Sequence, residues 1–247
     1  MKPTISPVGD CAISIDFGQA IDPKINRQIR QVIEQIKLLQ LDGIIELVPT
    51  YCALLVQYDA MVYTYSDICR ILDPILQESV TDSVIERVMI VEIPTVYGGE
   101  FGPDLGFVAS HNHISEDEVV SIHSGTDYLV YMLGFIPGFT YLGGMDPRIV
   151  TPRLSSPRTL IPAGSVGIAG EQTGTYPSDS PGGWQIIGRT PVTMYDMSKK
   201  QAALLQAGDY VRYVSIDENE FHRIKSLGME YIPSMYEVEV GELRGYK

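Results

Sequence analysis

The sequence predicts an α+β protein with two domains, an α/β sandwich over residues 1–83 and a β-barrel over residues 84–232, followed by a tail over residues 233–247. Its 247 residues suit one large domain or two ordinary ones. In the first part of the chain, strand and helix patterns follow one another in the order β-α-β-β-α-β. Over residues 127–135 and 158–213, short β segments alternate with frequent turns, which is typical of a barrel.

The first domain begins with an alternating strand pattern at residues 11–17 and continues into a helix. Asp22 is the expected N-cap of that helix, and Pro23 suits its first position. Apolar residues then recur every three or four positions up to Leu39, which is the spacing of one helical face. Asp42-Gly43 predicts the end of the helix.

Two apolar runs, residues 44–48 and 52–57, predict the next two strands. Ser66 is the expected cap of a second helix, and Pro74 inside its pattern predicts a kinked or shortened helix. The β-rich residues 86–93 supply the last strand. This order is that of a ferredoxin-like, or split βαβ, sandwich.

The second domain is expected to begin after a polar boundary at residues 79–83. Within it, Ser115 followed by Glu118 predicts a helix that opens with a capping box. Residues 217–226 predict another short helix. The acidic tail from Pro233 is expected to be loosely attached or bound to a partner.

The net charge of −13 limits the classes of partner. Nucleic acids and anionic membrane surfaces both need a basic face, so the sequence predicts neither. The first residues lack an apolar signal-peptide core, and no apolar run reaches about 18 residues, the length of a membrane-spanning helix. We therefore expect a cytoplasmic protein with reduced, mostly buried thiols. The cysteines are Cys11, Cys52 and Cys69.

Residues 134–191 hold 11 of the 23 glycines and 8 of the 16 prolines. Gly permits positive φ and close approach of a ligand, and Pro fixes φ, so this composition predicts a chain bent to build a site. The segment contains four arginines and no lysine, and arginine suits a carboxylate or phosphate held at two points. These arginines are Arg148, Arg153, Arg158 and Arg189. The alternative is that two or more of them pair with Asp146, Glu171 or Asp179.

Neutral donors, acceptors and apolar walls accompany the arginines in the sequence. They are Gln172, Thr173, Tyr176, Thr190, Phe139 and Trp184. Together with the arginines they predict a small anionic ligand. For each of them alone, core packing or turn structure is the competing role.

His123 ends a predicted helix just before the strand that leads into residues 134–191. A neutral histidine there would serve as a general base near physiological pH. The alternative is a helix-terminal histidine that interacts with the helix dipole. His111 and His113 would share one face of a strand, but no third ligand is evident, so no metal site is expected.

Several standard motifs are missing from the sequence. There is no G-x-x-x-x-G-K-[ST] motif, so a nucleotide would not be held by a P-loop. The glycine spacing over residues 164–170 is not the dinucleotide fingerprint. Ser165, His123 and Asp104 could in principle form a hydrolase triad, but Ser165 lacks the G-x-S-x-G elbow.

Several stretches of the chain nevertheless resemble one known family. They include GDCAISIDFG near the start, YGGEFGPDL, and then GFIPGFTYLGG, PAGSVGIAG, QTGTYP and SPGGWQIIGRTP. These stretches resemble the allophanate hydrolase subunit 1 family, also described as the Kip-inhibitor family or the family of 5-oxoprolinase B subunits. The resemblance extends at least from Gly9 to Thr190. It implies an N-terminal α/β domain and a cyclophilin-like β-barrel domain.

The resemblance also implies a function. Members act beside two other proteins, a C subunit that is allophanate hydrolase subunit 2-like and an A subunit that is LamB/YcsF-like. The complex is an ATP-dependent 5-oxoprolinase that opens 5-oxoproline to glutamate, with ATP and Mg bound at the level of the complex. The chain is expected to be inactive alone. Other family roles are inhibition of a sensor histidine kinase and a carboxyltransferase-like part of a urea carboxylase or allophanate hydrolase system.

Matching the family motifs onto this sequence gives a set of expected pocket residues. His123 is the expected acid/base, and Arg158 and Arg189 are expected catalytic anion clamps. The expected substrate-binding residues are Arg153, Gln172, Tyr176 and Thr190. No residues are assigned to ATP, and the resemblance to cyclophilin concerns the fold alone.

Overall fold

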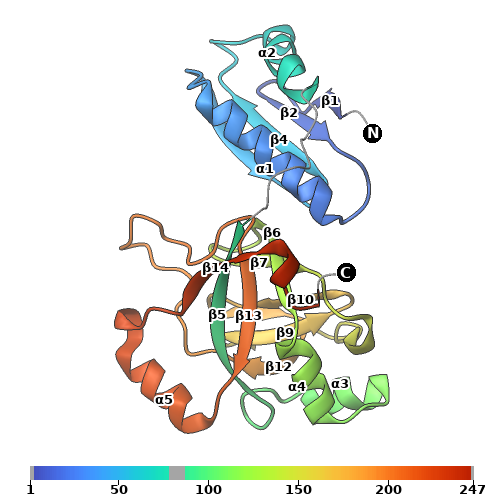
Figure 1. Cartoon of the computed structure of the whole chain (residues 1–247), viewed down its shortest axis with the longest axis vertical. Coiled ribbons are helices and arrows are strands. Elements are labelled where there is room, and N and C mark those ends of the chain that lie inside the picture. Colours follow the sequence, from blue (N-terminus) through green and yellow to red (C-terminus); the bar gives the residue numbers. More distant parts are fainter. Residues whose placement is uncertain (1–2, 78–86, 246–247) are drawn as a thin grey trace. The chain divides into compact units, whose positions relative to one another are not determined.

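The structure is a computed structural model of the chain and describes residues 3–77 and 87–245. It contains helices and strands in the mixed order of an α+β protein (Figure 1). Contacts divide the chain into two compact units, Met1–Val84 and Ile85–Lys247. The domain boundary that the sequence predicts, between residues 83 and 84, lies outside the described residues.

The first unit is a four-stranded antiparallel sheet with two helices. The strand order is β1-β2-β4-β3. Apolar side chains from the sheet and both helices form its core, among them Ile15, Val56, Ile29 and Leu72. The elements are β1 (Thr4–Pro7), β2 (Ala12–Asp16), α1 (Pro23–Leu38), β3 (Ile44–Pro49), β4 (Ala53–Tyr58) and α2 (Tyr65–Gln77).

The two helices of this unit follow their local sequence signals closely. The Asp22 side chain accepts a hydrogen bond from the Lys24 amide at 2.8 Å, which confirms the predicted cap of α1. In α2, the cap is Thr64 rather than Ser66, because Thr64 and Asp67 exchange hydrogen bonds at the first turn. Pro74 lies inside α2, and the helix continues to Gln77.

The last strand expected in the first sheet lies in the second unit. Strand β5 (Arg87–Tyr97) pairs with β12 (Gln185–Arg189), β13 (Tyr210–Ser215) and β14 (Met235–Glu239). The outer position beside β2 is taken by β1 instead. The predicted strand order grouped residues 86–93 with the first sheet, although the predicted domain bounds assigned them to the second domain, because an apolar pattern identifies a strand and not the strand beside it.

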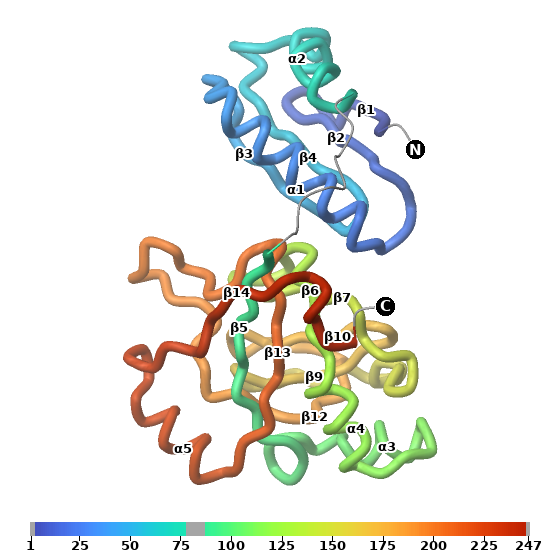
Figure 2. The backbone as a smooth tube through the Cα atoms, viewed as in Figure 1, coloured from blue at the N-terminus to red at the C-terminus, as the bar shows by residue number. Residues whose placement is uncertain are grey.

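The second unit is a nearly closed β-barrel sheet (Figure 2). Its order is β10-β9-β12-β5-β13-β6-β7, with β14 also paired to β5, and the end strands β10 and β7 contact each other. A separate two-stranded sheet joins β8 and β11. The remaining strands are β6 (Asp127–Leu133), β7 (Thr140–Gly143), β8 (Arg158–Ile161), β9 (Ser165–Ala169), β10 (Gln172–Thr175) and β11 (Ser180–Gly182).

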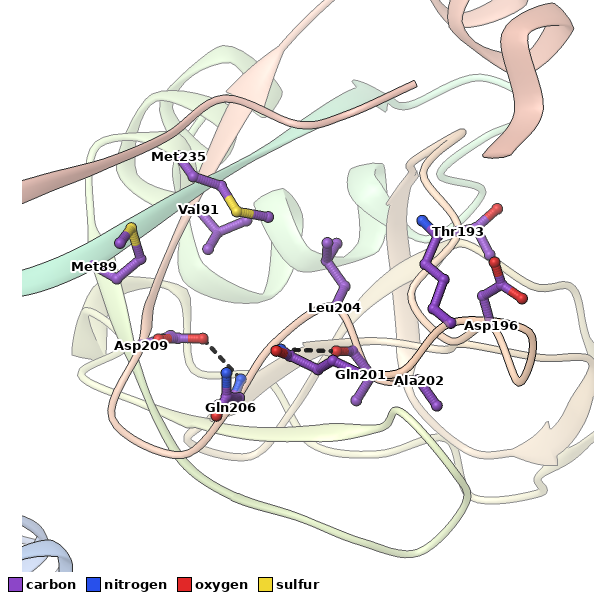
Figure 3. A pocket seen from close by; sticks show the side chains of 12 residues that line it. Met89, Val91, Thr193, Asp196, Gln201, Ala202, Leu204, Gln206, Asp209 and Met235 are labelled. Carbon is purple, nitrogen blue, oxygen red and sulfur yellow. Dashed lines mark hydrogen bonds between the residues drawn. The ribbon is translucent and has the colours of Figure 1, made fainter. Parts of the chain in front are cut away.

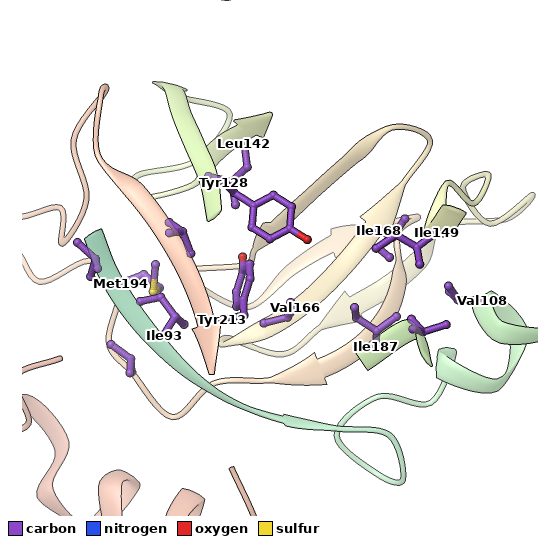
Figure 4. Close-up of a cluster of buried hydrophobic side chains, with 14 of the residues drawn as sticks. Ile93, Val108, Tyr128, Leu142, Ile149, Val166, Ile168, Ile187, Met194 and Tyr213 are labelled. Carbon is purple, nitrogen blue, oxygen red and sulfur yellow. The ribbon is translucent and has the colours of Figure 1, made fainter. Parts of the chain in front are cut away.

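The barrel encloses a core of aliphatic and tyrosine side chains (Figure 4). Ile168 and Ile187 enter it from neighbouring strands, and Tyr128 and Tyr213 approach edge to face with ring centroids 5.8 Å apart. Helices also accompany the sheet. They are α3 (Leu105–Asn112), α4 (Glu116–Ser124) and α5 (Glu218–Leu227).

Helix α4 confirms the predicted capping box. The Ser115 hydroxyl accepts from the Glu118 amide at 3.2 Å, and the Glu118 carboxylate accepts from the Ser115 amide at 2.8 Å. Helix α3 was not predicted, because turn-forming glycines and Pro103 precede it and its sequence has no clear apolar face. His111 lies in this helix, and His113 ends it with φ 57°.

The segment after Pro233 is paired with the barrel over its described residues. Strand β14 pairs antiparallel with β5, and the Arg244 amide donates to Asp127 Oδ2 at 2.8 Å. Its acidic composition gave no sign of this pairing, because edge strands often carry charged side chains.

The three cysteines are free thiols, as predicted, but they are not mostly buried. Cys11 is exposed, and Cys52 and Cys69 are half-buried. In the part of the chain that the structure describes, no helix has both the length and the apolar character needed to cross a membrane.

Candidate functional site

Of the predicted site residues, Gln172 lies on β10 and Arg189 on β12, and Tyr176 and Thr190 directly follow these strands, whereas His123 lies on α4 and Arg158 on β8. Strands β9, β10 and β12 present side chains to two faces of the sheet, and a register shift between Ile186 and Gly188 places Ile187 and Arg189 on opposite faces. On β9, Val166 and Ile168 enter the barrel core, which defines the inner face. Ala169 packs on the opposite side in a smaller cluster with Phe139 and Trp184, which defines the outer face. The two faces separate the candidate residues into two groups.

His123 belongs to the inner group. It lies at the end of α4 and is fully buried. Its Nδ1 is 2.8 Å from the Tyr97 hydroxyl, and its Nε2 is 2.8 Å from Thr173 Oγ1. Because both ring nitrogens form hydrogen bonds inside the core, His123 connects α4 to β5 and β10.

The hydrogen bonds of His123 also indicate its tautomer. The Thr173 hydroxyl donates its proton to the Gly167 carbonyl at 3.0 Å, so Thr173 Oγ1 accepts from His123 Nε2. Nδ1 then accepts from the Tyr97 hydroxyl. Burial lowers the pKa of His123 to about 3, which keeps the ring neutral at physiological pH.

The outer group contains Tyr176, Ser165 and Arg189, which lie in one row formed by β9, β12 and the residue that follows β10. Arg189 on β12 is the direct partner of Ser165 on β9. On the other flank, the Tyr176 amide donates to the Ser165 carbonyl at 2.9 Å. Directly paired residues of antiparallel strands present their side chains to the same face. We call these three residues the outer row.

Two polar atoms of the outer row have no hydrogen-bond partner among the described residues. They are the buried Ser165 Oγ and the buried Arg189 Nε. Gly164, which precedes the row with φ +81°, fixes the backbone here, because a Cβ on it would lie 2.2 Å from the Thr190 carbonyl oxygen. The outer row therefore follows a closely packed turn and retains hydrogen-bonding capacity.

Arg158 lies on the outer side but is paired within the chain. Its guanidinium contacts Asp104 at two points, 2.7 and 2.9 Å, and Asp104 also accepts from the Ile186 amide at 2.6 Å. The sequence prediction that some arginines pair internally is confirmed, although Asp104 was not among the acids considered. Arg148 pairs with Asp146 at 2.7 Å, as that alternative foresaw.

Tyr176 is buried between aromatic walls. Phe139 and Trp184 approach its ring edge to face, with centroids 5.7 and 5.9 Å away. Burial raises the pKa of Tyr176 to about 12, and the nearby charges of Arg153 and Arg158 oppose that rise. The phenol thus stays protonated, with positive charge close to it.

The other three predicted residues differ in their surroundings. Arg153 is exposed. Gln172 is half-buried opposite Ala169 and so lies on the outer face, further along the hairpin. Thr190 is buried, and its hydroxyl accepts from the Val192 amide at 3.2 Å, which stabilises the turn after β12.

In the sequence, Ser165 suggested only a nucleophile and not part of an anion site. Strand register reveals its place, because Ser165 and Arg189 face the same side only once β9 and β12 are paired. Ser180 was also missed, and its buried hydroxyl has no partner in the described part of the chain.

A cavity of about 350 Å³ lies elsewhere in the second unit (Figure 3). Met89, Val91 and Met235 provide apolar side chains to it, and Asp196 and Gln201 provide polar ones. None of the predicted site residues lines this cavity. We therefore do not take it as the candidate site.

Comparisons with known proteins give a consistent result. Residues 3–205 match the family described as Carboxyltransferase domain, subdomain C and D. The 5-oxoprolinase B subunit of Bacillus subtilis (strain 168) is 45% identical over 231 residues, which are 90% of this chain and 96% of that protein. The urea amidolyase of Saccharomyces cerevisiae is 23% identical over 87% of this chain, which spans only 13% of that protein.

A solved structure shares the fold. The crystal structure of TTHA0988 superposes with a TM-score of 0.73 and is 34% identical, over 83% of this chain and 40% of that one. The chain therefore spans less than half the length of this structural relative, whereas it spans nearly all of the Bacillus protein.

Proposed function

The chain belongs to the carboxyltransferase-domain family, and we propose that it works as the B subunit of an ATP-dependent 5-oxoprolinase, which opens 5-oxoproline to glutamate. The observation that carries this proposal is the 45% identity to a 5-oxoprolinase B subunit over almost the whole of both chains. The proposed enzyme is a hydrolase of a cyclic amide, and this chain is inactive alone.

We place the fold of this chain within the family pattern. The first unit is proposed to be ferredoxin-like and the second cyclophilin-like, with the boundary near residue 83. Its proposed partners are the C subunit, which resembles allophanate hydrolase subunit 2, and the LamB/YcsF-like A subunit. The proposed location is the cytoplasm.

The outer face fits recognition of a small anion. Arg189 and Arg153 offer positive charge, and Tyr176 offers a protonated phenol beside them. Arg158 is proposed to act through its pair with Asp104, which positions the strand that carries Ile186. Gln172 and Thr190 complete the proposed surroundings of the substrate.

His123 is proposed as a positioning residue rather than the acid/base. Its ring is buried and neutral, and each nitrogen already has a partner. Through Thr173 it supports β10 from the inner face, while Tyr176 follows that strand on the outer face.

At the level of the complex, ATP with Mg would supply an activated carbonyl, by transfer of the γ-phosphoryl group to the amide oxygen with release of ADP. In the described ranges, no group of three or more His, Cys, Asp or Glu side chains is arranged to hold a metal ion. The residues that would bind ATP and Mg in the complex are left unassigned. Its own residues bind and orient the substrate.

The proposal is tested by co-expressing this chain with its two proposed partners. We expect 5-oxoproline-dependent ATP hydrolysis from the three chains together and at most a few per cent of that rate when this chain is omitted. Full activity without this chain would refute the proposal.

One alternative has an observation in its favour. The distant likeness to urea amidolyase supports a carboxyltransferase-like part of a urea carboxylase or allophanate hydrolase system. It predicts turnover that depends on biotin, whereas the main proposal predicts turnover without biotin.

A KipI-like inhibitor of a sensor histidine kinase would instead lower kinase autophosphorylation in a purified mixture.

A further inference from the structure

We infer that the outer row of this chain is the receptor for the substrate carboxylate, with Ser165 as a binding residue beside Arg189. The identity of the ligand rests on the proposed function, whereas the placement of the site rests on the geometry of the row. Ser165 enters this site as a hydrogen-bond donor, with no role as a nucleophile.

Strand pairing places the side chains of Ser165 and Arg189 next to each other. Ser165 and Arg189 are direct partners in an antiparallel ladder, and such partners have Cβ atoms about 4.5–5.5 Å apart. Tyr176 flanks Ser165 on the other side, and its ring packs against Trp184. The row is thus bounded by an aromatic wall on one side and a guanidinium on the other.

The hydrogen-bonding state of the row points to a ligand. Ser165 is fully buried, and proteins rarely bury a hydroxyl without a partner. The hydroxyl could accept from Arg189 Nε, yet the two atoms are not bonded to each other. Both groups can donate, so a third group with acceptor oxygens satisfies them together.

The charge balance selects an anion. Asp104 neutralises Arg158, and Asp146 neutralises Arg148. Arg189 has no such partner within the described ranges, and its Nε is buried. A carboxylate matches a guanidinium edge at two points, and its second oxygen suits a neighbouring hydroxyl.

The neutral hydroxyl gives a test that separates binding from folding. Removing an unpartnered buried hydroxyl by converting the serine side chain to a methyl group breaks no hydrogen bond of the fold, so Ser165→Ala is expected to keep or raise the melting temperature. In the reconstituted three-subunit complex, the same variant is expected to raise the KM for 5-oxoproline at least tenfold, with kcat within about twofold.

The carboxylate is tested with 2-pyrrolidinone, which is the same lactam without the carboxyl group. The wild-type complex is expected to prefer 5-oxoproline strongly, and Ser165→Ala and Arg189→Ala are expected to lose most of that preference. Arg148→Ala is the matched control, because Arg148 is exposed and paired with Asp146. An unchanged KM and preference in Ser165→Ala would overturn the inference and leave the hydroxyl bonded to an ordered water.

Failure of the proposed function gives a different result. If the complex does not turn over 5-oxoproline at all, calorimetry of the full complex with 5-oxoproline and glutamate still tests the site. Carboxylate binding that Ser165→Ala and Arg189→Ala weaken would uphold the inference, whereas binding that is equal in wild type and both variants would overturn it.

Discussion

At the scale of single residues, the arginines differ by whether another side chain already neutralises them. The sequence singled out the four arginines of residues 134–191, and the prediction that some of them form ion pairs with acidic side chains is confirmed. It could not identify Asp104 as the partner of Arg158, because the two lie 54 positions apart and meet only in the folded barrel. Replacing Arg158 with Ala therefore removes a structural ion pair as well as a charge, which makes it a poorer probe of the site than Arg189.

His123 predicts a dependence of stability on pH. Its pKa is about 3 in the folded protein and near 6.5 when unfolded, so the unfolded chain binds the proton first as pH falls. The stabilisation is complete above about pH 6.5 and is lost progressively below it, by up to about 1.4 kcal/mol per pH unit.

The measurement is urea denaturation between pH 4 and 7 for wild type and His123→Asn. We expect the variant to be less stable at pH 7 and to show a shallower loss of stability on acidification. His111→Asn, at an exposed position, should follow the wild-type curve. Parallel curves for wild type and His123→Asn would show that the histidine titrates normally.

At the scale of elements, local signals predicted well and non-local pairing did not. The caps of α1 and α4 follow from two or three neighbouring residues, and both were predicted. The partners of β5 lie at least 91 positions further along the chain, since Tyr97 pairs with Gly188, and the strand pattern alone grouped β5 with the first sheet. The candidate site shares this limit, because it exists only through the pairing of β9 with β12.

One ion pair ties several of these elements together. Arg212 on β13 holds Asp127 on β6 at two points, 2.6 and 2.7 Å, and it also donates to the Tyr236 hydroxyl on β14. Both partners of the ion pair are buried. Removing Asp127 leaves the buried charge of Arg212 without the carboxylate that neutralises it, which is strongly destabilising.

We therefore expect Asp127→Ala to lower the free energy of unfolding by about 3–5 kcal/mol, measured by chemical denaturation. Glu220→Ala is the matched control, because its pair with Arg223 on α5 is solvent-exposed and such pairs contribute about 0–1 kcal/mol. Equal effects of the two variants would contradict the structural role given to Asp127.

At the scale of the whole molecule, the chain forms two compact units. Near its C-terminus, β14 pairs with β5, the first strand of the second unit. Family motifs in the sequence indicated the relationship to 5-oxoprolinase B subunits, which the comparisons confirmed. The motifs could not show that His123 and Arg189 lie on opposite faces of one sheet. That separation is why we propose a substrate-binding outer face supported by a buried histidine, and leave the ATP chemistry to the complex.

The most direct test compares Arg189→Ala with Arg148→Ala in the reconstituted complex, using kcat/KM for 5-oxoproline. Losing a charge-assisted, two-point contact is expected to lower kcat/KM about 30- to 100-fold, or about 2–3 kcal/mol. Arg148→Ala should stay within about twofold of wild type. Full activity of the Arg189→Ala complex, with its assembly intact, would contradict the carboxylate site on this chain.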